Sequence, residues 1–385
     1  MVCGPWVRVR GLSVSKNSLV GVAFFVFFAA LAFYTAFSPS QDKRVLHIYN
    51  WAHYIPASVI EAFEREEGVK VHYDAFSTLE ILEAKLLAAH SGYDLVFPPA
   101  FPTLKLFAPA GIFAKLDVTK MPNIQNLDPV VVEKLKMADP EGVYAVPYLW
   151  GTTGMIYHKE RVASLGDDPP YESWALLFSK PWLKKLAPYH VVLLDSPADV
   201  FPDVLFYKRK DPFGFHNDVL KEAASYLAEI RPFIYKFDSS QILQDLASER
   251  VAVAEIFSSY AHMAIAAWEK QTGHSPYCYV IPQEGALMWI DTMAIPRDSL
   301  NKDLAYKFMS FLMRPQVMAE ITNQTYTANA VMGTERWVDP YIQKQKTIYL
   351  DASVKKRLLL DQIPPRAYER LRLRYWTMIR AGHNL

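Results

Sequence analysis

The sequence predicts an α/β fold of two lobes joined by two crossover strands and preceded by an N-terminal apolar helix. Short apolar strands alternate with helical segments from Val45 onward, and a second set of such elements begins near Val191. Two further apolar segments, at residues 145–158 and 288–296, are too apolar for surface turns. We interpret these two segments as strands that cross from one lobe to the other.

Composition bounds the class of protein. The 385 residues are 51% hydrophobic and 14% aromatic, enough to bury one large core or two of medium size. Forty-one basic residues against 40 acidic ones leave a formal charge of +1, so a broad positive field for nucleic acid is excluded. Cys3 and Cys278 lie on opposite sides of the first apolar run, so neither a disulfide nor a thiolate metal cluster is expected. No cofactor is implied.

Residues 1–44 have the pattern of an export segment. Basic side chains such as Arg10 precede an uncharged apolar run at 19–37, and residues 30–32 offer a small-x-small cleavage site. The run is also close to the roughly 20 residues that span a bilayer. A cleaved signal peptide and a retained inner-membrane anchor both remain open, and in either case the rest of the chain is expected in the periplasm.

The first set of elements has the order β-α-β-α-β. Gly68 is typical of a helix stop, and Ser77 with Glu80 fits a capping box. This order predicts a parallel sheet, whose ligand sites lie at the carboxyl ends of the strands, where Trp51 and Tyr54 stand. The expected elements are a strand at 45–51, a helix at 57–67, a strand at 69–76, a helix at 79–90 and a strand at 94–99.

The second set predicts another α/β lobe, and one longer helix follows it. We assign lobe 1 to residues 45–150 with about 291–340, and lobe 2 to 151–290 with about 341–385. Two lobes joined by two crossings form a cleft that can close by hinge motion. The expected elements are a strand at 191–195, a helix from near 238 toward 250, strands at 251–257 and 277–282, and a helix from 302 to about 320.

Six segments carry a family resemblance, and they are residues 49–55, 93–98, 145–154, 194–201, 281–296 and 301–317. Through these segments the sequence resembles, in order and over nearly all of the chain from Val45, the periplasmic putrescine/spermidine-binding proteins of polyamine ABC transporters. The resemblance implies a type II periplasmic-binding-protein fold and a monomer that captures a polyamine or related small cationic amine and delivers it to a membrane permease.

A protonated polyamine sets its own requirements for a pocket. It alternates methylene segments with charges, so it needs flat apolar walls and anionic acceptors. The resemblance implies that Trp51 and Tyr54 form such a wall and that Asp199 stands where the family has a glutamate. It also implies that Asp291 and Trp289 act as a pair, and strand alternation places both side chains on one face.

Other positions depart from the family pattern. Ala52-His53 replaces a serine-aspartate pair, and Tyr260 stands where the family has an aspartate, so the pocket is expected to be aromatic but less negative. A less charged amine or an amino-acid derivative is therefore an alternative ligand. The remaining implied ligand positions are Phe101, Phe257, Tyr260 and Tyr326, with Thr327 beside Tyr326.

Two ionisable residues are further candidates for ligand contact, and each also has an alternative role that does not involve the ligand. Glu255 lies two residues before Phe257 on the same strand face and either contacts the ligand or serves as a hinge residue or in a structural ion pair. His53 could be neutral and accept a hydrogen bond, could be protonated and repel an amine, or could be a solvated residue at the lip of the site.

Two alternative functions remain. An enzyme with Asp199 and Asp291 as paired carboxylates is less expected, because the sequence has no GxSxG, HExxH, Walker-type loop or Cys-His pair in a suitable context. A membrane-anchored amine sensor that reports occupancy to a membrane partner is the other alternative.

Overall fold

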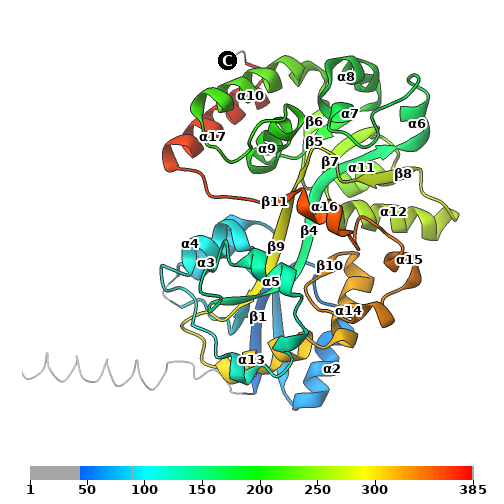
Figure 1. The fold of residues 1–385 in the computed structure, drawn as a ribbon. Coiled ribbons are helices and arrows are strands. Elements are labelled where there is room, and N and C mark those ends of the chain that lie inside the picture. Colours follow the sequence, from blue (N-terminus) through cyan, green and yellow to red (C-terminus); the bar gives the residue numbers. More distant parts are fainter. Residues whose placement is uncertain (1–43, 89, 384–385) are drawn as a thin grey trace, which may run out of the picture. The chain divides into compact units, whose positions relative to one another are not determined.

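One mixed sheet organises residues 44–88 and 90–383, which are the residues that the computed structural model describes (Figure 1). The strand order is β2-β1-β3-β9-β4-β7-β5-β6, with β8 and β10 paired to β4 and β11 paired to β9. The strands are β1 (Val45–Trp51), β2 (Lys70–Phe76), β3 (Leu95–Val96), β4 (Ala145–His158), β5 (Val191–Leu193), β6 (Lys236–Phe237), β7 (Val253–Phe257), β8 (Tyr277–Val280), β9 (Ala286–Ala294), β10 (Ala328–Asn329) and β11 (Leu358–Leu360).

Two groups of parallel strands flank a central antiparallel pair. β1 is parallel to β2 and β3, and β5 is parallel to β6 and β7. Between the groups run β4 and β9, paired antiparallel from Ala145↔Ala294 to Thr152↔Met288 with a register shift between Pro147 and Trp150. Every residue of β4 is buried, as expected for a strand with neighbours on both edges and cover on both faces.

The helices cover both groups of strands. Around the β1 group lie α2 (Ala57–Glu67), α3 (Leu79–Leu86), α4 (Lys105–Phe107), α5 (Pro129–Leu135), α13 (Lys302–Leu312) and α14 (Pro315–Thr325), with η1 (Ala100–Leu104), η2 (Val118–Lys120), η3 (Ile124–Asn126) and η6 (Thr334–Arg336) as single turns. The others are α6 (Lys159–Ala163), α7 (Ala175–Phe178), α8 (Lys180–Leu186), α9 (Pro197–Tyr207), α10 (Asn217–Ile230), α11 (Ile242–Ala247), α12 (Ser258–Thr272), α15 (Pro340–Gln343), α16 (Ala352–Lys356) and α17 (Arg366–Arg380), with η4 (Ala187–Tyr189) and η5 (Arg231–Phe233).

Local capping decides where several helices begin and end. Gly68 ends α2 with φ 65°, which confirms the predicted stop. The predicted Ser77–Glu80 capping box is wrong, because the Oγ1 atom of Thr78 accepts the hydrogen bond from the Ile81 N–H at 3.4 Å. The single helix predicted from residue 302 to about 320 is also wrong, because Pro315 forces the residue before it into an extended conformation and opens a separate helix, α14.

The helix predicted from near Asp238 begins later than expected. Asp238 instead accepts hydrogen bonds from the backbone N–H groups of Ser240 and Gln241, which closes a turn of its own. The helix α11 therefore begins at Ile242.

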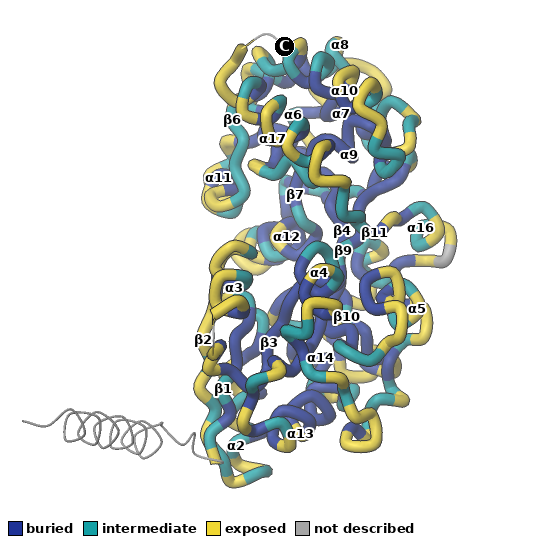
Figure 2. Tube along the Cα trace, turned by 90° about the vertical axis from the view of Figure 1, so that its left-hand side faces the viewer, coloured by how far each residue is buried: buried dark blue, intermediate teal, exposed yellow. Residues whose placement is uncertain are grey.

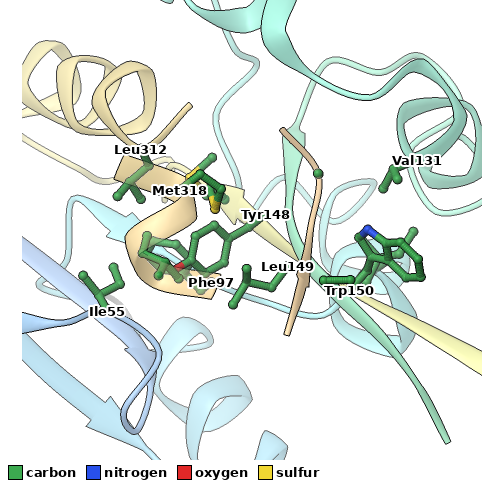
Figure 3. Close-up of a cluster of buried hydrophobic side chains, with 14 of the residues drawn as sticks. Ile55, Phe97, Val131, Tyr148, Leu149, Trp150, Leu312 and Met318 are labelled. Atoms are coloured by element: carbon green, nitrogen blue, oxygen red, sulfur yellow. The ribbon is translucent and has the colours of Figure 1, made fainter. Parts of the chain in front are cut away.

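Two clusters of buried side chains form the core, and the chain passes between them near its end. The larger cluster extends from the β1 group under α11 and α12, and Figure 3 shows part of it around Tyr148 and Phe97. The smaller cluster lies among α7 to α10 and α17. Leu358 and Leu360 belong to the larger cluster, whereas Tyr368 belongs to the smaller one. Figure 2 shows the buried residues concentrated along the sheet.

The predicted N-terminal export or anchor segment at 19–37 lies outside the described residues. Within residues 44–88 and 90–383, no helix has the length and apolarity to cross a bilayer.

Candidate ligand-binding site

A cavity of about 480 Å³ lies where the parallel strands of both groups end. Its lining includes the residues that follow β1, β2, β3, β5, β7 and β11, together with one stretch of β9. This is the place where open α/β sheets bind ligands, and the volume is within the range of small-molecule sites.

The lining is aromatic and acidic. Three carboxylates, Asp199, Asp291 and Asp361, reach the cavity, and among the described residues that line it there is no lysine, arginine or histidine. No group of three or more His, Cys, Asp or Glu residues in the described part of the chain has an arrangement suited to a metal ion. The aromatic side chains are Trp51, Tyr54, Phe76, Phe101, Phe257, Tyr260 and Trp289.

Trp51 is held in place at the end of β1. The hydroxyl of Tyr73 donates to the Trp51 carbonyl oxygen at 2.9 Å, and the indole packs against Phe76 with ring centroids 4.5 Å apart. The Nε1 of Trp51 donates to Oδ1 of Asp291 at 3.2 Å. The indole therefore serves both as a wall and as a donor that orients a carboxylate.

Asp291 is the most deeply buried acid of the cavity, with 4% of its surface exposed. Burial raises the pKa of this carboxyl to about 7, and hydrogen bonds with Trp51 and Tyr54 oppose the shift. The pKa of Tyr54 is raised well above its usual value, mainly by burial, so its hydroxyl stays protonated and available as a donor. The carboxylate of Asp291 is thus held by neutral donors without a cationic partner on the lining.

Asp199 lies in the first turn of α9, directly after β5. Its carboxylate accepts hydrogen bonds from Oγ1 of Thr153 at 3.0 Å and from Oγ of Ser196 at 2.5 Å. Burial raises its pKa, and these two bonds and the more distant Arg372 oppose the rise. The group is fixed in position by β4 and by the turn that opens α9.

The sequence prediction missed Asp361. This residue follows β11, which pairs parallel with β9 so that Leu360 stands beside Met288. Burial, followed by the negative charge of Asp199, raises the pKa of Asp361 to about 7. The signal was present as three leucines followed by an aspartate, which is a short strand with an acid at its carboxyl end. The sequence analysis expected a less negative pocket without including Asp361, which adds a carboxylate to the lining.

Trp289 lies on β9 beside a glycine of β4. A Cβ atom at Gly151 would lie 2.3 Å from Cζ2 of Trp289, so only glycine allows this close approach. The Nε1 atom of Trp289 is buried and has no hydrogen-bond partner among the described residues. Trp289 and Asp291 both line the cavity, as strand alternation predicted.

Eight of the predicted ligand residues are brought together in this cavity, and the structure places four others outside its lining. Glu255 lies one pleat deeper than Phe257 and is fully buried, where it accepts a hydrogen bond from the Leu194 N–H at 3.1 Å. His53 is exposed in the turn after β1. Tyr326 ends α14 with φ 53°, and the hydroxyl of the buried Thr327 donates to the Thr325 carbonyl oxygen.

The fold and the cavity define a protein that binds a small ligand at the carboxyl ends of its strands. Residues 58–338 match the model of a family described as bacterial extracellular solute-binding proteins. The chain belongs to this family, which confirms the resemblance noted from its segments at the level of the family.

Three relatives illustrate the similarity. The putrescine-binding periplasmic protein SpuD of Pseudomonas aeruginosa is 37% identical over 89% of this chain and 94% of its own length. The putrescine-binding periplasmic protein PotF of Escherichia coli is 37% identical over 89% of this chain and 93% of its own. The solved structure of the TpPotD lipoprotein of Treponema pallidum has a TM-score of 0.75 at 26% identity, covering 88% of this chain and 99% of that one. The fold is therefore the α/β periplasmic-binding-protein fold.

Proposed function

We propose that this protein captures putrescine or a related small polyamine outside the cytoplasm and delivers it to an ABC permease. One observation carries the proposal: the lining of the cavity combines aromatic walls with three carboxylates and, among its described residues, no basic side chain. The names of the relatives, which describe putrescine-binding periplasmic proteins, support the same ligand class.

The chemistry of the lining suits an alkyl ammonium ion. Methylene groups lose water favourably against the faces of Trp51 and Trp289, and an ammonium group gains from the nearby aromatic quadrupole. The ammonium itself loses several kcal/mol of hydration on burial unless a carboxylate receives it. Asp291 supplies that carboxylate on the β9 side, held ready by the Trp51 indole.

We further propose that the ligand closes two lobes. Lobe 1 comprises residues 45–150 with about 291–340, and lobe 2 comprises 151–290 with about 341–385. Because Trp51 comes from one group of strands and Asp199 from the other, a ligand that contacts both stabilises the closed arrangement, which a permease can distinguish from the open one.

Calorimetric titration of the full chain, purified in a non-ionic detergent, tests the ligand class. Putrescine, spermidine, cadaverine and agmatine are compared with 1,4-butanediol, a neutral molecule of matching length. We expect saturable binding of at least one amine and none of the diol. Equal binding of the diol, or no binding of any amine, would overturn the proposal.

The proposed location is the periplasm, as for the relatives named above. Mass spectrometry of the protein purified from the envelope of its bacterial host distinguishes a processed chain from one that keeps residues 19–37. Recovery in the cytoplasm would contradict the proposal. Gel filtration of the same sample tests the expected monomer.

A further inference from the structure

We propose that Asp361 contacts the ligand directly and that, with Asp199, it binds the second ammonium group of a diamine whose first ammonium group lies at Asp291. The inference rests on the proposed amine-binding function and deepens it by assigning the two ammonium groups of a diamine to separate positions in the cavity. It assigns a binding role to the segment between β11 and α17.

Backbone pairing puts Asp361 at the cavity. β11 pairs with β9 from Leu358↔Ala286 to Leu360↔Met288, so the next residue, Asp361, emerges at the edge where Trp289 enters the lining. The main-chain ladder fixes this position, so the side chain does not depend on a flexible loop to reach the cavity.

Asp361 has an acceptor available for a ligand. One oxygen, Oδ1, accepts a hydrogen bond from the Gln362 N–H at 2.7 Å. No hydrogen bond from residues 44–88 or 90–383 reaches the other oxygen, Oδ2. An ammonium group carries three donors, and the Oδ2 atom together with the carboxylate of Asp199 offers it acceptors.

The charges around Asp199 and Asp361 favour a cation. The two carboxylates lie close enough for Asp199 to disfavour ionisation of Asp361. Arg372 lies near both, but its guanidinium forms an ion pair with Glu369 at 2.7 Å, so together these two residues add almost no net charge. An ammonium group placed between Asp199 and Asp361 relieves their mutual repulsion.

Asp291 forms a separate acidic point of the lining. Burial, Trp51 and Tyr54 account for its electrostatic state, and no second carboxylate contributes to it. The cavity therefore presents one single and one paired carboxylate position along an aromatic wall. This distribution matches a chain of methylene groups with a cation at each end. A monocation could pair with a carboxylate at only one of the two positions.

The decisive measurement is the ratio of two dissociation constants, that of 1-aminobutane divided by that of 1,4-diaminobutane. Calorimetry on the full chain in detergent measures it for the native protein, for Asp361→Asn and for Asp167→Asn. The asparagine keeps the acceptor for the Gln362 N–H and removes only the charge. Asp167 is an exposed acid in the loop after α6, so its variant is the matched control.

We expect the ratio to fall at least tenfold in Asp361→Asn and to stay within twofold of the native value in Asp167→Asn. An unchanged ratio in Asp361→Asn, with native diamine affinity, overturns the role of Asp361 while leaving the amine-binding function standing. Absence of amine binding in the native protein overturns the proposed function instead. If Asp361→Asn does not fold by circular dichroism, Asp361→Ser is titrated under the same criterion.

Discussion

At the scale of single residues, Asp291 is the carboxylate that we propose receives an ammonium group of the ligand. It is buried against Trp51 and Tyr54, which donate hydrogen bonds to its ionised form but cannot neutralise it. We expect Asp291→Asn to weaken putrescine binding by about 1.5–3 kcal/mol, the range of a hydrogen bond to a charged group. Calorimetry measures the loss, and circular dichroism checks the fold. Native affinity in this variant would remove Asp291 from the site.

The carboxyl groups also predict a dependence of binding on pH. The pKa values of Asp291 and Asp361 are both raised to about 7, mainly by burial, and an ammonium ion binds best when both groups are ionised. Affinity for putrescine should therefore rise between pH 5 and pH 8, by up to about tenfold per pH unit for each carboxyl below its pKa.

The same pKa values imply proton release on binding at pH 7. Titrations in two buffers with different ionisation enthalpies measure the number of protons released. Uptake of protons, or an affinity independent of pH over this range, would contradict the assignment.

Gly151 gives a residue-scale test that leaves all charges intact. A methyl group at this position would collide with the indole of Trp289 and with Oγ of Ser258, 2.6 Å away. We expect Gly151→Ala to displace the ring and to weaken amine binding by about tenfold or more, because the aromatic wall loses its shape. Calorimetry and tryptophan fluorescence check the two effects. Native affinity with unchanged fluorescence would show that the ring does not form a wall of the site.

At the scale of elements, β7 and α9 enclose an acidic pair beneath the cavity. Glu255 on β7 and Asp203 on α9 are both fully buried. Burial raises the pKa of Glu255 to about 8, and burial together with the negative charge of Glu255 raises that of Asp203. The pair therefore retains at least one proton at neutral pH, which allows one carboxyl group to donate to the other.

This pair predicts a decline of stability with rising pH. Between about pH 4.5 and pH 8 the unfolded chain releases the Glu255 proton, whereas the folded protein keeps it, so the free energy of unfolding falls as pH rises. With about 1.4 kcal/mol per pKa unit, the fall is on the order of a few kcal/mol. Glu255→Gln keeps an acceptor for the Leu194 N–H and should flatten this slope.

Urea unfolding at pH 5, 6.5 and 8 measures the slope for the native chain, for Glu255→Gln and for Glu61→Gln. Glu61 is an exposed acid on α2 and serves as the control. Equal slopes for the native chain and Glu255→Gln would show that the buried pair does not hold the proton.

The elements also show how far the sequence alone could lead. The strand that ends at Trp51, the long strands β4 and β9 and the stop at Gly68 follow from apolar runs and glycine chemistry, and all four are present. The capping of α3 by Thr78 could not be distinguished from capping by its neighbour Ser77, since either hydroxyl suits the position.

Asp361 shows why the site was only partly predictable. Its contribution depends on β11, a strand of three residues whose partner in the ladder lies more than 70 positions earlier. No local pattern specifies such a pairing, so a carboxylate at its end is not assigned to the cavity until the register is known. Trp51 and Tyr54 could be placed at the site because they stand at or just beyond the end of a clearly patterned strand, whereas Trp289 and Asp291 were assigned to it through the family resemblance.

At the scale of the whole molecule, the proposed binding of an amine in the cavity would couple the two groups of strands. A ligand that binds only the folded protein stabilises it by about 2.7 kcal/mol at a concentration of 100 times the dissociation constant. Differential scanning calorimetry with putrescine should show a rise of several degrees in the melting temperature, with no rise for 1,4-butanediol. An equal rise with both compounds would mean that charge is not recognised.

The position of Asp361 has one more consequence. Trp51 ends the first strand of the described fold and Asp361 precedes its last helix, so a diamine that contacts both, as we propose, would link the first and last parts of the described residues. Carboxypeptidase would then digest the protein with a bound diamine more slowly than the protein without ligand. The liganded protein would also take longer to unfold when its C-terminal end is pulled. A bound ligand would in this way protect the protein from degradation.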